Sequence, residues 1–172
     1  AASADDVCDI ISYTPFEVAD QTFTGTIDIT GELKTTTLGT SNFRAGVNAG
    51  DAIASGGNYN VVVGDEAGTA ITTGDDNVAV GYSAGAAVTT GTENTLLGGK
   101  SGEALTVGYM NIAIGQRALQ SDTKGNKTVA IGKQTLATQN FTTATDTFNT
   151  AVGHNAGFAV TTGIKNTLIG SV

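Results

Sequence analysis

Apolar and polar positions recur with a fixed period from residue 42 to the end of the chain. A phrase of Asn, a short apolar run and Gly returns every seventeen residues, with one step of eighteen at the start and one of twenty-one near the end. A period of this size is the signature of a solenoid, in which each repeat stacks on the next. The alignment predicts coils that start near Asn42, Asn60, Asn77, Asn94, Asn111, Thr128, Asn149 and Asn166.

Glycine stands four residues after the start of every coil. A backbone position that needs positive φ, or a close approach of two chain segments, accounts for this column. The predicted turn glycines are Gly64, Gly81, Gly98, Gly115, Gly132, Gly153 and Gly170, and Gly46 precedes them in the first, degenerate copy.

Two apolar columns precede each turn glycine. The third residue of each coil after Asn is mostly β-branched, and we expect this column to be a buried strand face. Its members are Val63, Val80, Leu97, Ile114, Ile131, Val152 and Ile169. The preceding column, with Val62, Ala79 and Leu96, is also apolar but smaller. Because neighbouring strand residues face opposite sides, the coil interior covers one face, and a neighbouring chain most simply covers the other.

The Asn column predicts a ladder of side-chain amides that pair from coil to coil, as in stacked cross-β structures. The ladder residues are Asn60, Asn77, Asn94, Asn111, Asn149 and Asn166. Thr128 interrupts the ladder, and the coil that follows carries four extra residues within 136–148. We expect this insertion to bulge as a loop, with an exposed Phe141 or Phe148 as a possible contact surface.

The second half of each coil contains Thr-Thr-Gly turns at 72–74, 89–91 and 161–163. Ala70, Ala87 and Ala159 are expected in a second short strand. The predicted fold is therefore all-β: a β-solenoid with coils of about seventeen residues, each with two short strands and two turns.

The phrase NTAVGHNAGFAVTTGIKNTLIG at 149–170 resembles the head repeats of YadA-like trimeric autotransporter adhesins, and equally the Asn-x-Ala-Val-Gly repeats of bacteriophage tail fibres and other appendages. The resemblance covers residues 42–172. It implies a left-handed parallel β-roll and a parallel homotrimer, with three rolls around a common axis.

Two different segments precede the repeats. Residues 22–33, TFTGTIDITGEL, alternate strictly, which predicts a half-buried strand within a β region at 22–41. Similar phrases occur in phage fibre and baseplate proteins. Residues 1–21 hold the single Pro and several apolar residues. They predict an arm that docks onto other virion proteins or caps the first coil.

Composition excludes several function classes. The chain has 24 Gly, few aromatic residues and a net charge of -8 without a basic run, so we expect no nucleic-acid binding. It lacks an apolar span of about 20 residues, so we expect no membrane insertion. Cys8 is the single cysteine and cannot form an intrachain disulfide. The chain starts without Met and stops within a repeat phrase, so we expect it to belong to a longer polypeptide.

Motifs of catalysis and cofactor binding are absent from the sequence. His154 is the only histidine and falls in a variable polar column, so we expect it on the surface. No nucleophile–base pair can be built around it, and one Cys with one His cannot form a zinc site. Neither the EF-hand nor the calcium-solenoid pattern occurs, so we expect no metal and no cofactor.

These patterns favour a non-enzymatic, extracellular structural protein: a trimeric fibre or appendage segment of a phage virion, which displays surfaces to a host receptor of glycan or protein. The alternative is a trimeric adhesin head on a bacterial surface. A third reading is an ice-binding solenoid, because one column is rich in threonine. That column contains Thr72, Thr89, Thr106, Thr123 and Thr161.

Overall fold

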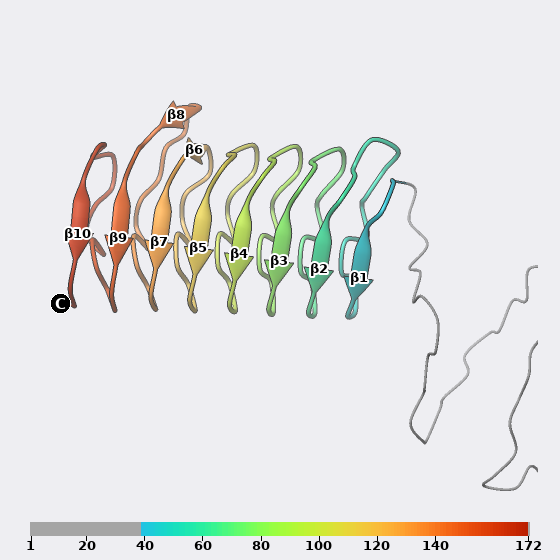
Figure 1. Cartoon of the computed structure of the whole chain (residues 1–172), viewed down its shortest axis with the longest axis horizontal. Helices are drawn as coiled ribbons and strands as arrows, with labels where there is room; N and C mark the ends of the chain where they lie inside the picture. The colour runs from blue at the N-terminus through green and yellow to red at the C-terminus, as the bar shows by residue number, and fades with distance from the viewer. Residues whose placement is uncertain (1–38, 172) are drawn as a thin grey trace, which may run out of the picture. The chain divides into compact units, whose positions relative to one another are not determined.

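The computed structural model describes residues 39–171, which form a parallel β-solenoid without any helix in that range (Figure 1). This confirms the predicted all-β solenoid. The expectations for residues 1–21 and 22–33 lie outside the described residues. The strands are β1 (Phe43–Ala45), β2 (Val61–Val63), β3 (Val78–Val80), β4 (Thr95–Leu97), β5 (Ile112–Ile114), β6 (Gly125–Asn126), β7 (Val129–Ile131), β8 (Thr145–Asp146), β9 (Thr150–Val152) and β10 (Thr167–Ile169).

Eight strands form one sheet in the order β1-β2-β3-β4-β5-β7-β9-β10, and every pair is parallel. The register joins equivalent residues of successive coils, for example Val78 to Thr95 and Val129 to Thr150. The same column of the sequence therefore becomes one row of touching side chains along the solenoid. Strands β6 and β8 form a separate parallel pair at the inserted loop.

The interior is filled by the middle residues of β2, β3, β4, β5, β7 and β9. The fully or almost fully buried members are Val62, Ala79, Leu96, Ala113, Ala130 and Ala151. An Ala-rich row that includes Ala67 and Ala84, and a larger row of Ile71, Val88 and Leu105, complete the core. The interior column is thus the smaller of the two apolar columns, because the space inside a seventeen-residue coil is narrow.

Side-chain volumes compensate between positions of the same coil. Leu96 is a large middle residue, and a Cβ added to Gly102 would come within 2.8 Å of its Cδ2. In the next coil the middle residue is Ala113, and Leu119 takes the position equivalent to Gly102. Leu119 is fully buried. The core therefore stays filled although neither column has a constant size.

The prediction of a second strand around Ala70, Ala87 and Ala159 is wrong, because these residues lie in turns. Successive coils still pair there through single backbone bonds, such as Thr72 N to Thr89 O at 2.9 Å. The backbone is folded tightly by turn bonds such as Ile71 N to Gly68 O at 3.0 Å. Such bends leave no extended stretch for a strand.

Candidate functional site

The Asn side chains form a buried ladder through the first five coils. Asn94 shows the pattern: its Nδ2 donates to Asn77 Oδ1 at 3.0 Å and to Gly108 O at 2.9 Å. Its Oδ1 accepts from both the backbone N–H and Nδ2 of Asn111, each at 3.1 Å. Asn60 and Asn77 repeat this arrangement. Asn111 donates in the same way, and Asn149 pairs with Asn166 further along. Each amide joins two coils and a turn, which is a structural role.

The inserted segment repairs the ladder where Thr128 interrupts it. Thr128 N still donates to Asn111 Oδ1 at 3.0 Å, but its side chain offers no amide. Gln139 and Thr147 supply the missing groups: Asn149 Nδ2 donates to Gln139 Oε1 at 2.7 Å, and the hydroxyls of Thr128 and Thr147 lie 2.7 Å apart. The insertion therefore carries side chains that continue the ladder into β9.

Asp122 is a fully buried carboxylate beside this repair. Its Oδ1 accepts from the backbone N–H groups of Gly125 and Phe141, at 3.1 and 3.0 Å. Its Oδ2 accepts from Gln139 Nε2 at 2.7 Å. Three donors satisfy the carboxylate without a cation, as a buried charge requires. Asp122 thereby anchors the base of the inserted loop and is not placed for acid–base chemistry.

The seven predicted turn glycines share one backbone conformation, with φ between 125 and 131°. Each of them except Gly170 packs on the backbone of the next glycine: a Cβ added to Gly98 would lie 2.7 Å from the carbonyl carbon of Gly115. Both reasons given for this column, positive φ and close approach, therefore apply at the same positions.

A Gly98→Ala variant is expected to lose about 2–4 kcal/mol of unfolding free energy, because the methyl group combines backbone strain with a clash against the next coil. Gly99→Ala is the matched control, since its Cβ would meet only Tyr82 O at 3.9 Å. We expect the control to change stability by less than about 0.5 kcal/mol. Urea unfolding measures both values, and equal losses would contradict the packing argument.

The predicted buried column lies on the outside of the sheet, which corrects the expectation. Val63, Val80, Leu97, Ile114, Ile131 and Val152 are only half-buried, and Ile169 is 77% exposed. They point away from the interior because the middle residues, one position earlier, point into it. Together with the first residue of each strand they form the outer stripe. Its members are Phe43, Ala45, Val61, Val63, Val78, Val80, Thr95, Leu97, Ile112, Ile114, Val129, Ile131, Thr150, Val152, Thr167 and Ile169.

The two phenylalanines of the predicted contact loop differ. Phe141 is 7% exposed and is therefore unavailable as a contact, whereas Phe148 is 50% exposed. Beside Phe148, Lys127 Nζ lies 2.6 Å from Asp146 Oδ2, and 5.3 and 5.7 Å from the ring centroids of Phe148 and Tyr109. The hydrogen bond to Asp146 raises the pKa of Lys127, and the same bond lowers the pKa of Asp146. This cluster fixes β8 over β6, where the insertion protrudes beyond the other coils (Figure 1).

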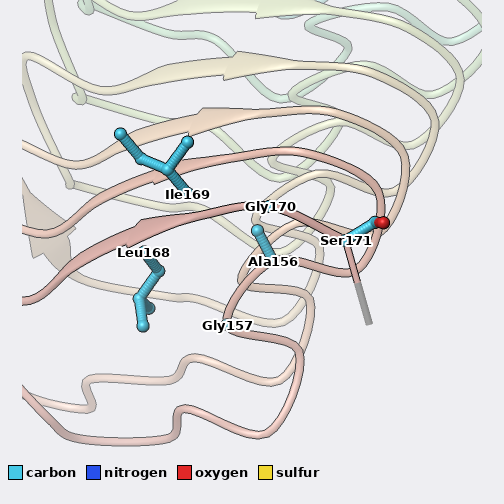
Figure 2. A pocket seen from close by; sticks show the side chains of 6 residues that line it. All are labelled: Ala156, Gly157, Leu168, Ile169, Gly170 and Ser171. Carbon is cyan, nitrogen blue, oxygen red and sulfur yellow. The ribbon is translucent and has the colours of Figure 1, made fainter.

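The hollow at the last coil is the open end of the core (Figure 2). It measures about 160 Å³ and is lined by the turn residues Ala156 and Gly157 and by residues 168–171. Leu168 and Ile169 project from opposite sides of β10. Within the described residues no later coil lies against Leu168, so its surroundings are apolar and open. The lining offers no set of polar groups that could orient a substrate.

Residues 39–171 contain no group of three or more His, Cys, Asp or Glu side chains that could hold a metal ion. His154 is exposed, as expected. In the same range there is no helix long and apolar enough to cross a membrane. Comparison of the chain with protein-family models, curated proteins and solved structures finds no match.

Proposed function

We propose that this chain is a non-enzymatic, structural segment of an extracellular fibre, and that three parallel copies assemble around a common axis. The observation that carries the proposal is the outer stripe. Thirteen of its sixteen positions are apolar and the other three are threonine, over eight stacked strands. Parallel sheets are normally covered on both faces, and contiguous exposed apolar surface marks interfaces. Two further copies of the same stripe would cover it.

The role would be mechanical. Backbone and Asn ladders join the coils, and the outer stripe would join the chains into a stiff rod. Eight strands at about 4.8 Å spacing give a rod roughly 35 Å long. Such a rod can hold the loop around Phe148 away from the axis, where a host-surface receptor would meet it. The arm at 1–21 would dock onto other virion proteins.

The setting we favour is a phage virion, because the alternating phrase at 22–33 resembles those of phage fibre and baseplate proteins. A bacterial adhesin head would use the same stripe and is the alternative. Neighbouring capsid or tail genes would favour the virion. A signal peptide upstream and a membrane-anchor barrel downstream would favour the adhesin.

The threonine column supports ice binding less than the outer stripe supports a trimeric fibre. The hydroxyls of Thr72, Thr89 and Thr106 donate to the backbone carbonyl of the next coil, at 3.2, 3.2 and 2.9 Å. These bonds hold the hydroxyls within the solenoid. The neighbouring file of threonines is interrupted by Val107 and Lys124.

The solution mass tests the proposal. Light scattering of the chain is expected to give about 52 kDa, three times the chain mass of 17.2 kDa. A mass of one chain at every concentration would overturn the trimer, because the outer stripe would then be stable in water.

A further inference from the structure

Two columns of residues border the outer stripe. The residue directly before the start of each coil forms the leading border, and the residue directly after each turn glycine forms the trailing border. On the coils of β2 and β3 the leading border carries Tyr59 and Asp76, and the trailing border carries Asp65 and Tyr82. All four residues are exposed, the two tyrosines by 56 and 52%.

These four side chains make no hydrogen bond and no ion pair within residues 39–171. Lys100 Nζ lies 5.8 Å from the ring centroid of Tyr82, but this contact does not involve the phenol hydroxyl. The two borders therefore present phenols and carboxylates whose hydrogen-bonding groups are left to water or to another chain.

The two coils carry the same pair in opposite order. The coil of β2 has tyrosine on the leading border and aspartate on the trailing border, and the coil of β3 has aspartate first and tyrosine second. A buried Asn, a three-residue strand and a turn glycine separate the members of each pair, so they do not meet within one chain. A phenol O–H donates to a carboxylate, so the members of each pair are chemically complementary.

Three parallel copies around a common axis bring the two borders together. Rotation about an axis parallel to the solenoid keeps every coil at its own height. When the outer stripes face the axis, the leading border of one chain lies beside the trailing border of the next, coil by coil. Tyr59 then meets the partner's Asp65, and Asp76 meets the partner's Tyr82.

An axial shift of one coil removes this complementarity. A shift in one direction brings Asp76 against the partner's Asp65, so that two carboxylates face each other, although Glu93 then meets the partner's Tyr82. A shift in the other direction brings Tyr59 against the partner's Tyr82 and separates both rings from a carboxylate. Complementary groups across an interface fix its register, and like charges there are disfavoured. Chains at equal height are therefore favoured.

One pair of the two borders is like-charged at equal height, because Lys127 lies beside the partner's Lys133. Lys127 is already paired within its own chain, where its Nζ lies 2.6 Å from Asp146 Oδ2. This ion pair reduces the repulsion between the two lysines.

We infer that the two tyrosine–aspartate pairs form between neighbouring chains of the trimer and hold the chains at one height. This inference rests on the proposed function, since it assigns the contacts that would fix the register of that trimer. Chains without an axial shift close into a ring, whereas a constant shift would continue as an open helix. The pairs therefore favour a closed assembly over an open filament.

A double-mutant cycle on Tyr82 and Asp76 tests the inference, with the dissociation of the trimer followed by light scattering on dilution. Tyr82→Phe keeps the ring and removes the hydroxyl, and we expect it to weaken association about tenfold per interface. In an Asp76→Ala background we expect the same substitution to weaken association less than about twofold.

Glu93→Ala is the matched background. Glu93 is the next carboxylate on the leading border and would meet the partner's Tyr82 only after a shift of one coil. In this background we expect Tyr82→Phe to keep its full effect of about tenfold.

Equal effects of Tyr82→Phe in all three backgrounds would overturn the inference, because Tyr82 would then have no carboxylate partner in the trimer. A reduced effect in the Glu93→Ala background alone would also overturn it and would indicate chains shifted by one coil. Light scattering of the unsubstituted chain separates the two proposals. A trimer without the coupling refutes the inference alone, whereas a single chain at every concentration refutes the proposed function and the pairs with it.

Discussion

Replacement of Ile114 by Asp is expected to leave the solenoid folded but to separate the proposed trimer into single chains of 17.2 kDa. Ile114 lies in the middle of the outer stripe and is only half-buried in one chain. An aspartate there is solvated in the isolated chain. In the trimer it would place an unpaired carboxylate in an apolar interface, which costs several kcal/mol per chain. Light scattering across a range of concentrations, with circular dichroism to verify the fold, measures the effect.

Ile114→Thr is the matched control. Thr95 and Thr150 already occupy positions of the same stripe, so a threonine is compatible with its packing. We expect this variant to retain the trimer with a weaker association. A trimeric Ile114→Asp protein would show that the stripe does not lie at the interface.

Replacement of Asn94 by Ala is expected to lower the unfolding free energy by about 3–5 kcal/mol. Four hydrogen bonds of the side chain disappear, and the buried N–H of Asn111 and carbonyl of Gly108 lose the partner that Asn94 provides. A buried polar group without a partner costs more than the bond itself contributed. Urea unfolding followed by circular dichroism measures the loss.

Asn166→Ala provides the comparison within the same ladder. Asn166 is only partly buried, and its side chain makes a single ladder bond, to Asn149 Oδ1 at 3.1 Å. We expect a loss of about 1 kcal/mol. A loss of only about 1 kcal/mol for Asn94→Ala as well would mean that the amide ladder contributes little, and that backbone hydrogen bonds and apolar packing hold the coils together.

The start and length of each coil could be predicted, because a parallel ladder requires the same backbone path at every rung. The equivalents of Asn94 and Gly98 must then recur at fixed distances along the chain, and both columns are visible in the sequence. The direction in which each apolar column points could not be read in the same way. Side-chain size suggested that Ile114 is inside, whereas the narrow interior holds Ala113 and takes its remaining volume from Leu119.

The buried, hydrogen-bonded pair of Asp122 and Gln139 at the insertion was not predicted, although the sequence indicates it. Ile71, Val88 and Leu105 stand seventeen residues apart, and the next two positions of that column are Asp122 and Gln139. Two polar residues in a core column, next to the Thr128 break, indicate a hydrogen-bonded replacement for apolar packing.

The sequence did not indicate that the residue before the start of each coil adopts a left-handed backbone conformation. Met110, Lys127 and Phe148 each precede a strand with φ between 50 and 56°. A non-glycine residue in this conformation costs about 1–2 kcal/mol. The stacked backbone imposes the conformation on whichever residue occurs there, so residue types vary freely. Phe148 occupies such a corner and is exposed, whereas Phe141 lies within the insertion, where no column of the repeat indicates its burial.

The constant spacing of the ladders also determines how this chain can fold. Hydrogen bonds such as that from Asn77 to Asn60 join residues seventeen apart, and only the pairing of β7 with β9, across the insertion, needs a loop closure as long as twenty-one residues. For 172 residues this spacing corresponds to a relative contact order of about 0.1, in the range of fast-folding helical proteins. Any two adjacent coils can serve as a nucleus from which order spreads in both directions. Growth would slow at the insertion, because five hydrogen-bonded side chains must meet there before β9 can pair: Asp122, Thr128, Gln139, Thr147 and Asn149.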